Sequence, residues 1–235
     1  DKSAYNLNQI GSGSVSGTTT ITGGTWNLRD STYLDFDGTT DYVQTASYSP
    51  NAGYDNITVS MWVNLNAAGQ SDVPLINRRS GGLGNEWQLF LYDTSDKPAF
   101  TWWSSTTEYG GGKTGSTALT VGEWHHIVAT VDTAGGLLNY YFDGEPDGSY
   151  TGVTSGRIYN VGQKLDIAKY STTYTNTKMR DVKVYKTTLT AAQVDLLYKG
   201  QWVGSPTHWW LFNEGTGDTV VDIGVGDSGA GLEDG

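Results

Sequence analysis

The chain has 235 residues, a formal net charge of −11 and no cysteine, which suits one large domain and excludes disulfides and thiol chemistry. Its 14 Lys and Arg residues form no cluster beyond Arg78-Arg79, so the charge disfavours a nucleic acid or an anionic membrane surface as partner. The 32 Gly, 15 Tyr and 9 Trp residues are typical of an all-β protein with many short strands and turns. No apolar run reaches the ~18 residues of a membrane-spanning helix.

The N-terminal quarter of the chain predicts several strands. Residues 18–22 carry enough Thr and Ile for an edge strand, and LDFDGTTDYV at 34–43 predicts a hairpin that turns at Asp37-Gly38. Apolar and polar side chains then alternate over residues 57–65, with the period of a strand that buries one face. A polar substitution at Met61, within this strand, is therefore expected to unfold the domain.

The next strands bring aromatic residues together. Residues 87–92 and 99–103 predict a second hairpin, in which the adjacent Trp102 and Trp103 point to opposite faces. We therefore expect one of these two rings to lie near solvent or in a groove. The long Gly-rich segment 104–117 has no periodicity and is expected to be a loop.

The segment GEWHHIVATVDTAGGLLNYYFDG at 122–144 predicts a central hairpin, because its two alternating halves flank a Gly-Gly turn. Residues 145–156 are rich in turn residues, and residues 170–176 are expected to form a polar loop. One helix is predicted near the end of the chain. Thr190 supplies its N-cap, and Gln193 three residues later completes a capping box.

Four blocks of the sequence, in order, resemble laminin-G-like, concanavalin A-like jelly rolls. WHHIVATVD at 124–132, followed by LNYYFDG at 138–144, is similar to the central hairpin of that family. The other blocks resemble its early hairpin, its next core strand and its late strand with a helix behind it: LDFDGTTDYV at 34–43, ITVSMWVN at 57–64 and MRDVKVYKTTLTAAQVDLLYKG at 179–200. The resemblance implies one antiparallel two-sheet jelly-roll sandwich over residues 1–235, with a core at 18–200 and one short helix.

The C-terminal segment 207–235 contains HWWLFNEGTGDTVVD, which is similar to the segment that opens a laminin-G-like repeat. Here this segment comes last. Three alternatives follow: the segment closes the sheet of its own domain, begins a second repeat, or pairs with a neighbouring subunit.

No residue pattern of a catalytic centre is present. The Glu residues are isolated, so no strand carries the paired carboxylates that a glycosidase uses. Alternation sends the rings of His125 and His126 to opposite faces, which favours a structural role for both. We therefore expect no enzyme activity, and three His without Cys also disfavour a zinc site.

Calcium is the candidate cofactor, because oxygen ligands are plentiful. The candidate ligands are Asp218, Asp222 and Asp227 in the tail, and Asp37 and Asp41 form a second acidic pair in the first predicted hairpin. The other interpretation is that these residues bond their own backbone in turns.

Glycan binding would use exposed aromatic faces with polar side chains beside them. The candidate ligand-binding residues, which lie on or next to predicted loops, are Trp102, Trp103, Tyr109, Tyr170, Tyr174 and Asn176. A sandwich core that buries these rings and a Tyr-rich protein interface are the other interpretations.

The leading hypothesis is a non-catalytic recognition module at an extracellular, cell-surface or virion location. It would bind a glycan or a surface protein through loops at one rim. The alternative is a structural phage or virion decoration or appendage protein that acts through contacts with neighbouring subunits. The sequence leaves the ligand, the host organism and the oligomeric state open.

Overall fold

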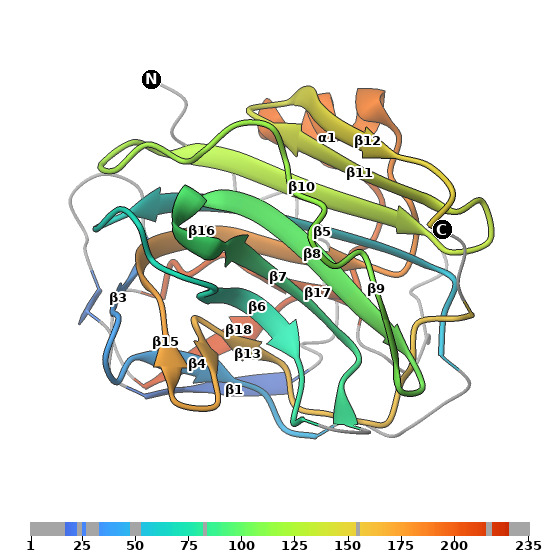
Figure 1. Ribbon diagram of the computed structural model, residues 1–235. Helices are drawn as coiled ribbons and strands as arrows, with labels where there is room; N and C mark the ends of the chain where they lie inside the picture. Colours follow the sequence, from blue (N-terminus) through green and yellow to red (C-terminus); the bar gives the residue numbers. More distant parts are fainter. Residues whose placement is uncertain are drawn as a thin grey trace, which may run out of the picture.

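The computed structural model describes residues 17–22, 25–26, 33–47, 53–81, 84–153, 156–214 and 218–225, with side chains from residue 33 onward. Its strands form two antiparallel sheets that pack face to face, and one short α-helix lies outside them (Figure 1). The predicted jelly-roll sandwich is confirmed.

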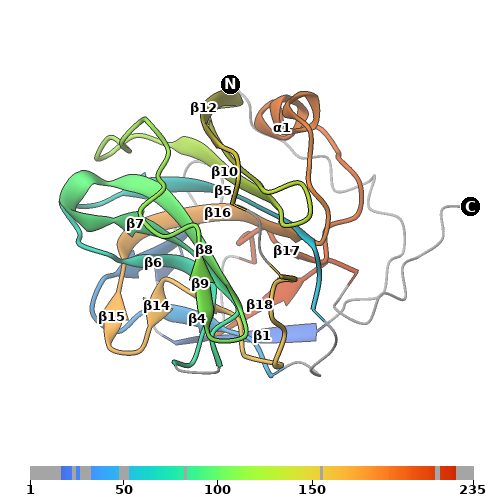
Figure 2. The same ribbon diagram turned by 45° about the vertical axis from the view of Figure 1, so that its right-hand side comes forward.

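Within the described part of the chain, the two sheets each contain eight strands. Sheet A has the order β18 (Thr219–Asp222), β1 (Gly17–Thr22), β4 (Tyr42–Gln44), β13 (Asp166–Ile167), β6 (Pro74–Arg78), β7 (Trp87–Tyr92), β8 (Lys97–Ser104) and β9 (Thr107–Tyr109). Sheet B has the order β12 (Glu145–Tyr150), β11 (Leu137–Phe142), β10 (His125–Asp132), β5 (Asn56–Leu65), β16 (Asn176–Tyr185), β3 (Leu34–Asp37) and β2 (Thr25–Trp26), and β17 (His208–Trp210) also pairs with β16. A small hairpin of β14 (Lys169–Tyr170) and β15 (Thr173–Tyr174) forms a separate two-stranded sheet (Figure 2).

The main core lies between the sheets and follows the predicted alternation. Ile57, Val59 and Met61 of β5 have no exposed surface and belong to the same continuous core cluster as Trp87 and Phe100 of sheet A. Burial of each aliphatic side chain contributes about 1.5–3 kcal/mol. The central strand and the β10–β11 hairpin form as predicted, with Gly136 in the left-handed conformation (φ 65°) at the turn.

A second cluster lies on the outer side of sheet B, where α1 (Ala191–Tyr198) covers it. The predicted capping box is present, because Thr190 Oγ1 accepts the Gln193 amide and Gln193 Oε1 accepts the Thr190 amide. Val194 and Leu197 are buried against the outer face of sheet B. Among the described residues, no helix is long and apolar enough to cross a membrane.

The C-terminal segment pairs with strands of its own chain in both sheets. β17 pairs with β16 in sheet B, and β18 pairs with β1 in sheet A. His208 Nδ1 lies 2.6 Å from Asp222 Oδ2, and Asp222 Oδ1 accepts the Trp209 amide at 2.9 Å. These buried contacts tie the two tail strands, and hence the two sheets, to each other.

The predicted hairpin at residues 34–43 is wrong, because β3 lies in sheet B and β4 lies in sheet A. The Asp37 carboxylate accepts the amides of Thr39, Thr40 and Asp41 at 2.7–3.1 Å, so the turn carries the chain from one sheet to the other. Burial would raise the pKa of Asp37, but these hydrogen bonds and the Thr39 hydroxyl hold it well below its ordinary value.

Three segments expected to be loops or turns contain strands. Residues 104–117 include β9, residues 145–156 include β12, and residues 170–176 include β15. β9 and β12 are edge strands whose sequences, TEY and EPDGSY, lack apolar alternation. Because an edge strand buries little of either face, the period-two signal is missing.

Candidate functional site

Sheet A carries a row of polar side chains across its outer face, which we call the polar row. Five apolar residues on adjacent strands are cross-strand neighbours in the core: Val43, Ile167, Ile76, Leu89 and Phe100. The residue next to each of them is polar, and these five are again in register: Gln44 on β4, Asp166 on β13, Asn77 on β6, Gln88 on β7 and Thr101 on β8. Because successive side chains of a strand point to opposite faces, the polar row faces away from the core.

Two oxygen atoms of the polar row are buried without a hydrogen-bond partner among the described residues. They are Asn77 Oδ1 and Thr101 Oγ1, in side chains whose residues are 0% and 1% exposed. Asn77 Nδ2, by contrast, donates to the Lys169 carbonyl at 2.7 Å. Since buried polar atoms in folded proteins are almost always hydrogen-bonded, these two oxygens are suited to accept a bond from a ligand or an ordered water molecule.

Asp166 is the carboxylate of the polar row. Its Oδ1 accepts Gln44 Nε2 at 2.7 Å, and the residue is 9% exposed. Burial raises the pKa of Asp166, although the Gln44 hydrogen bond and the charges of Lys169 and Lys164 oppose this effect. The polar row is therefore made almost entirely of neutral hydrogen-bonding groups plus one poorly solvated acid.

A cation between two aromatic rings lies on the same face. The Arg79 guanidinium carbon is 4.6 Å from the ring centroid of Trp103 and 4.1 Å from that of Tyr170. Arg79 Nη1 also donates to Gln88 Oε1 of the polar row. Burial lowers the pKa of Arg79, and the neighbouring Tyr170 and Glu108 oppose this.

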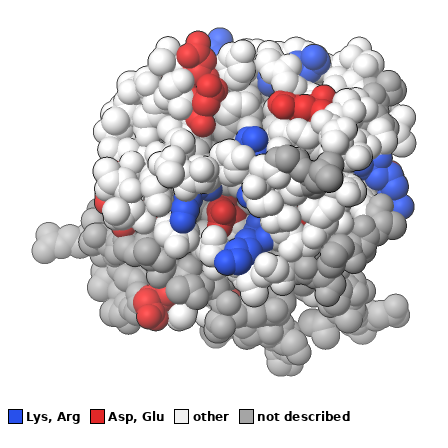
Figure 3. All heavy atoms as spheres, turned by 60° about the horizontal axis from the view of Figure 1, so that its bottom comes forward, with Lys and Arg blue, Asp and Glu red and all other residues white. Residues whose placement is uncertain are grey.

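The β14–β15 hairpin adds a second contact of this kind. Lys169 Nζ is 3.7 Å from the ring centroid of Tyr42 and 5.6 Å from that of Tyr174. β14 lies against β6, so the hairpin rests on the outer face of sheet A beside Asn77. Figure 3 shows this side of the molecule, where Lys and Arg side chains flank a recessed acidic side chain.

The structure brings together three of the six predicted ligand-binding residues. Trp103, Tyr170 and Tyr174 lie on the outer face of sheet A or on the hairpin that rests there. Trp102 lies in the core with no exposed surface and stacks on Tyr109, with ring centroids 5.9 Å apart. Asn176 lies on β16 of sheet B, where its backbone amide donates a hydrogen bond to Gln70 Oε1.

Of the two surroundings expected for one of the rings of Trp102 and Trp103, near solvent or in a groove, the first is wrong. The two rings do point to opposite faces, but Trp102 is 0% exposed and Trp103 is 5% exposed. Alternation places Trp103 on the outer face of the sheet, and the Arg79 side chain then covers it. The strand pattern alone predicts an exposed Trp103 ring, but Arg79, which is distant in the sequence, covers it.

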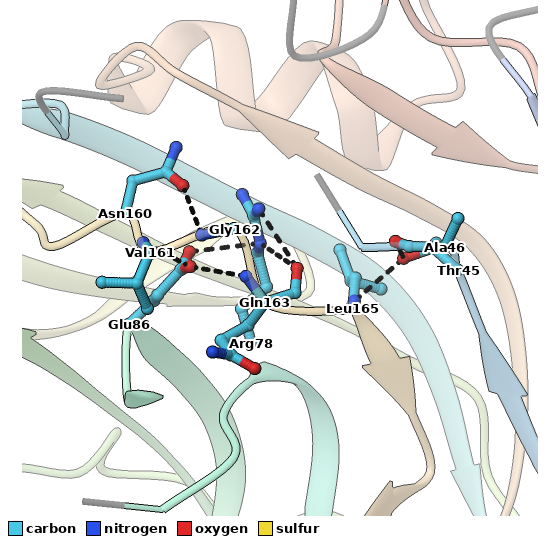
Figure 4. Close-up of polar contacts among 9 residues, drawn as sticks. All are labelled: Thr45, Ala46, Arg78, Glu86, Asn160, Val161, Gly162, Gln163 and Leu165. Carbon is cyan, nitrogen blue, oxygen red and sulfur yellow. Dashed lines mark hydrogen bonds and ion pairs between the residues drawn. The ribbon is translucent and has the colours of Figure 1, made fainter. Parts of the chain in front are cut away.

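A buried ion pair supports one end of this face (Figure 4). Arg78 Nε lies 3.2 Å from Glu86 Oε2, and both side chains are at most 2% exposed. Glu86 Oε1 accepts the amides of Val161 and Gln163 at 2.9 and 3.0 Å. The pair therefore holds the loop that leads into β13, the strand that carries Asp166. The burial of the pair and the two backbone amides bound by Glu86 Oε1 indicate a structural role.

None of the five residues of the polar row was predicted as a site residue from the sequence. Three of them are single polar residues at the outward positions of apolar strands, in LIN, WQL and FTW. That pattern could have marked each residue separately. The register that aligns them depends on strands far apart in the chain, so the row itself was not visible.

The candidate calcium ligands do not converge among the described residues. Asp222 is buried and bonds His208, Asp218 is exposed, and Asp227 lies outside the described residues. Asp37 and Asp41 bond the turn between β3 and β4. Among the residues that the structure describes, no three His, Asp or Glu side chains form a metal-binding group.

The paired histidines have separate structural surroundings. His125 Nδ1 lies 3.0 Å from Asp143 Oδ2, and His126 Nε2 lies 2.9 Å from Ser60 Oγ. Both residues are at least nine-tenths buried. Burial and the charge of Lys183 lower the pKa of His126 to about 4, so its ring is neutral at pH 7.

Comparisons with known proteins agree with the geometry of the fold. A laminin G family model described as the Concanavalin A-like lectin/glucanases superfamily matches residues 37–195, more than half of the chain. A search of curated proteins finds no match.

Solved structures with the same fold include a heptameric SAP-like pentraxin from Limulus polyphemus, at 13% identity and a TM-score of 0.58, covering 90% of this chain and 94% of the pentraxin. Two botulinum neurotoxin structures match with TM-scores of 0.59. The first is the type C toxin, whose cell entry depends on two ganglioside molecules (12% identity, 83% of this chain and 49% of that one). The second is the DC binding domain in complex with rat synaptotagmin II (13% identity, 80% and 48%). The chain thus spans about half the length of these toxin structures.

Proposed function

Because the chain belongs to the Concanavalin A-like lectin/glucanases superfamily, we propose that it is a non-catalytic recognition module that binds a glycan on the outer face of sheet A. The supporting observation is the polar row, in which Asn77 Oδ1 and Thr101 Oγ1 are buried without a described partner. Sugar hydroxyl groups supply the hydrogen-bond donors that such oxygens require.

The surroundings of the polar row also favour a sugar ligand. The half-buried rings of Tyr42, Tyr170 and Tyr174 lie beside it, and aromatic surfaces pack against the apolar C–H faces of sugars. The ganglioside-dependent toxin of the same fold supports a glycan as the ligand class. An extracellular or cell-surface location is part of this proposal.

The single carboxylate of the polar row supports binding without catalysis. Glycoside hydrolysis uses two carboxyl groups across the scissile bond. In the polar row, Asp166 is the one acidic residue, and Gln44 already bonds its Oδ1.

A glycan array, followed by calorimetry on the best ligand, tests this function. Thr101→Val keeps the shape of the side chain but removes its hydroxyl, and is expected to weaken binding about tenfold. Asn139→Ala on β11, on the other side of the sandwich, is the matched control and is expected to bind as the unmodified chain does. Absence of binding across the array, or equal affinity of Thr101→Val, would contradict the proposal.

A protein partner is the second candidate function, favoured by one exposed side chain. Trp202 is 65% exposed and packs on Trp209, with ring centroids 5.4 Å apart. Exposed Trp residues are enriched at the energetic centres of interfaces. If this surface joins subunits of an assembly, light scattering should detect an oligomer that Trp202→Ser dissociates. A monomer at all concentrations would argue against self-assembly.

A further inference from the structure

The β14–β15 hairpin leaves sheet A through an unusual backbone conformation. Ala168 (φ 63°) begins the excursion after β13, and Ser171 (φ 56°) occupies the turn between β14 and β15. Both are non-glycine residues in the left-handed region, which costs conformational energy. The Thr175 amide donates to the Ala168 carbonyl at 3.0 Å, so the base of the hairpin is closed.

The base and the rest of the hairpin are held differently. At the base, Thr175 is fully buried and its hydroxyl bonds the Pro74 carbonyl. Beyond the base, the contacts of the hairpin with sheet A include a hydrogen bond from Asn77 to the Lys169 carbonyl, a side-chain hydrogen bond between Arg79 and Tyr170, and contacts of aromatic rings with each other and with the Arg79 and Lys169 cations. Cation–aromatic contacts at half-exposed sites are weak. Such a segment is expected to open locally at far lower cost than global unfolding.

The position of the hairpin matters because of what lies under it. The Lys169 carbonyl accepts a hydrogen bond from the side-chain amide of Asn77, which lies in the middle of the polar row. A ligand that accepts this hydrogen bond from Asn77 Nδ2 would have to displace the backbone carbonyl. The hairpin therefore competes with any ligand for the centre of the row.

We propose that the β14–β15 hairpin is a movable cover of the polar row, and that an uncharged glycan displaces it, with a sugar hydroxyl replacing the Lys169 carbonyl on Asn77. This inference depends on the proposed glycan-binding function. The ligand is uncharged because the row offers amide and hydroxyl groups, and because the nearby cations are already engaged. Arg79 lies between two rings, and Lys164 Nζ donates to Gln44 Oε1 at 3.0 Å. The net charge of −11 also opposes an anionic ligand.

A movable cover makes the apparent affinity depend on the open fraction. If the site binds only when the hairpin is open, the apparent Kd is the intrinsic Kd divided by that fraction. Lys169→Met keeps an unbranched side chain but removes the charge that lies over Tyr42. Losing one such contact is expected to raise the open fraction about two- to fivefold.

The test compares Lys169→Met with Lys178→Met, a control on β16 of sheet B, using uncharged and sialylated oligosaccharides from the array. For the uncharged ligand, Lys169→Met should raise the association rate constant and lower the Kd about two- to fivefold, while Lys178→Met changes neither. In the ligand-free protein, hydrogen exchange over residues 169–174 should accelerate by the same factor without a change over β5.

Each contrary result has a distinct meaning. Unchanged association and exchange rates in Lys169→Met would overturn the movable cover while leaving glycan binding intact. Weaker binding that is confined to sialylated ligands would overturn the uncharged ligand and identify Lys169 as a direct contact. If the unmodified chain and both variants bind no glycan, the proposed function itself would be overturned. Equal melting temperatures of the two variants verify that both are folded.

Discussion

His126 makes the stability of this protein depend on pH in a way that can be worked out from its surroundings. His126 is 1% exposed and lies between β5 and α1. Its Nε2 is hydrogen-bonded to Ser60 Oγ, and its ring centroid lies 5.3 Å from that of Trp62 and 6.0 Å from that of Tyr198. The charged groups that act on it are Lys183, Asp181 and Asp143. Burial first, and then the charge of Lys183, lower its pKa from 6.5 to about 4.

The sign of the effect follows from proton linkage. The unfolded chain takes up a proton on this His near pH 6.5, whereas the folded protein resists it down to about pH 4. The contribution of His126 is therefore fully present above pH 6.5 and is lost as the pH falls towards 4. At ~1.36 kcal/mol per pKa unit, the loss reaches about 3 kcal/mol.

Urea unfolding of the unmodified chain and of His126→Gln, at pH values from 7.5 to 4, measures this contribution. Gln cannot titrate, so the free energy of unfolding of the variant should fall less on acidification. The stability gap between the two proteins should narrow by about 3 kcal/mol over this range. A gap that stays constant with pH would refute the assignment of the acid sensitivity to His126.

Three further predictions concern the tail, the core and calcium. Asp222→Asn removes the buried carboxylate partner of His208 and is expected to cost about 1–3 kcal/mol in urea unfolding, whereas Asp218→Asn at an exposed position, measured in chelator, should change nothing; equal effects would contradict a structural role for Asp222. Met61→Ala in the core should cost about 2–5 kcal/mol, while Leu196→Ala, on the 36% exposed side chain of α1, should stay within about 0.5 kcal/mol. If the tail binds calcium through the predicted ligands Asp218, Asp222 and Asp227, a chelator should lower the melting temperature, and an unchanged value would rule out that site.

The sequence predicts the elements whose signals are local. The alternation in β5, the Gly-Gly turn between β10 and β11, and the capping box of α1 each depend on residues close together in the chain. Strand membership in a sheet is not local. The turn at Asp37 therefore looks like a hairpin, although it carries the chain from sheet B to sheet A.

The candidate site was predicted only in part for the same reason. Tyr170 and Tyr174 stand out as aromatic residues in a polar segment, and both lie at the site. Trp103 is present but covered, because Arg79 from the end of β6 packs on its ring. The polar row joins residues as far apart as Gln44 and Asp166, so it becomes visible only when the strand register is known.

The proposed glycan site lies on the outer face of sheet A, where direct binding can be measured. The most direct measurement is NMR of the side-chain amide groups of Gln44, Asn77 and Gln88 during titration with the best glycan from the array. Shifts at these amides, with the amide of Asn139 on β11 unchanged, are the predicted result. Shifts at Asn139 while the three amides of the polar row stay constant would contradict the claim.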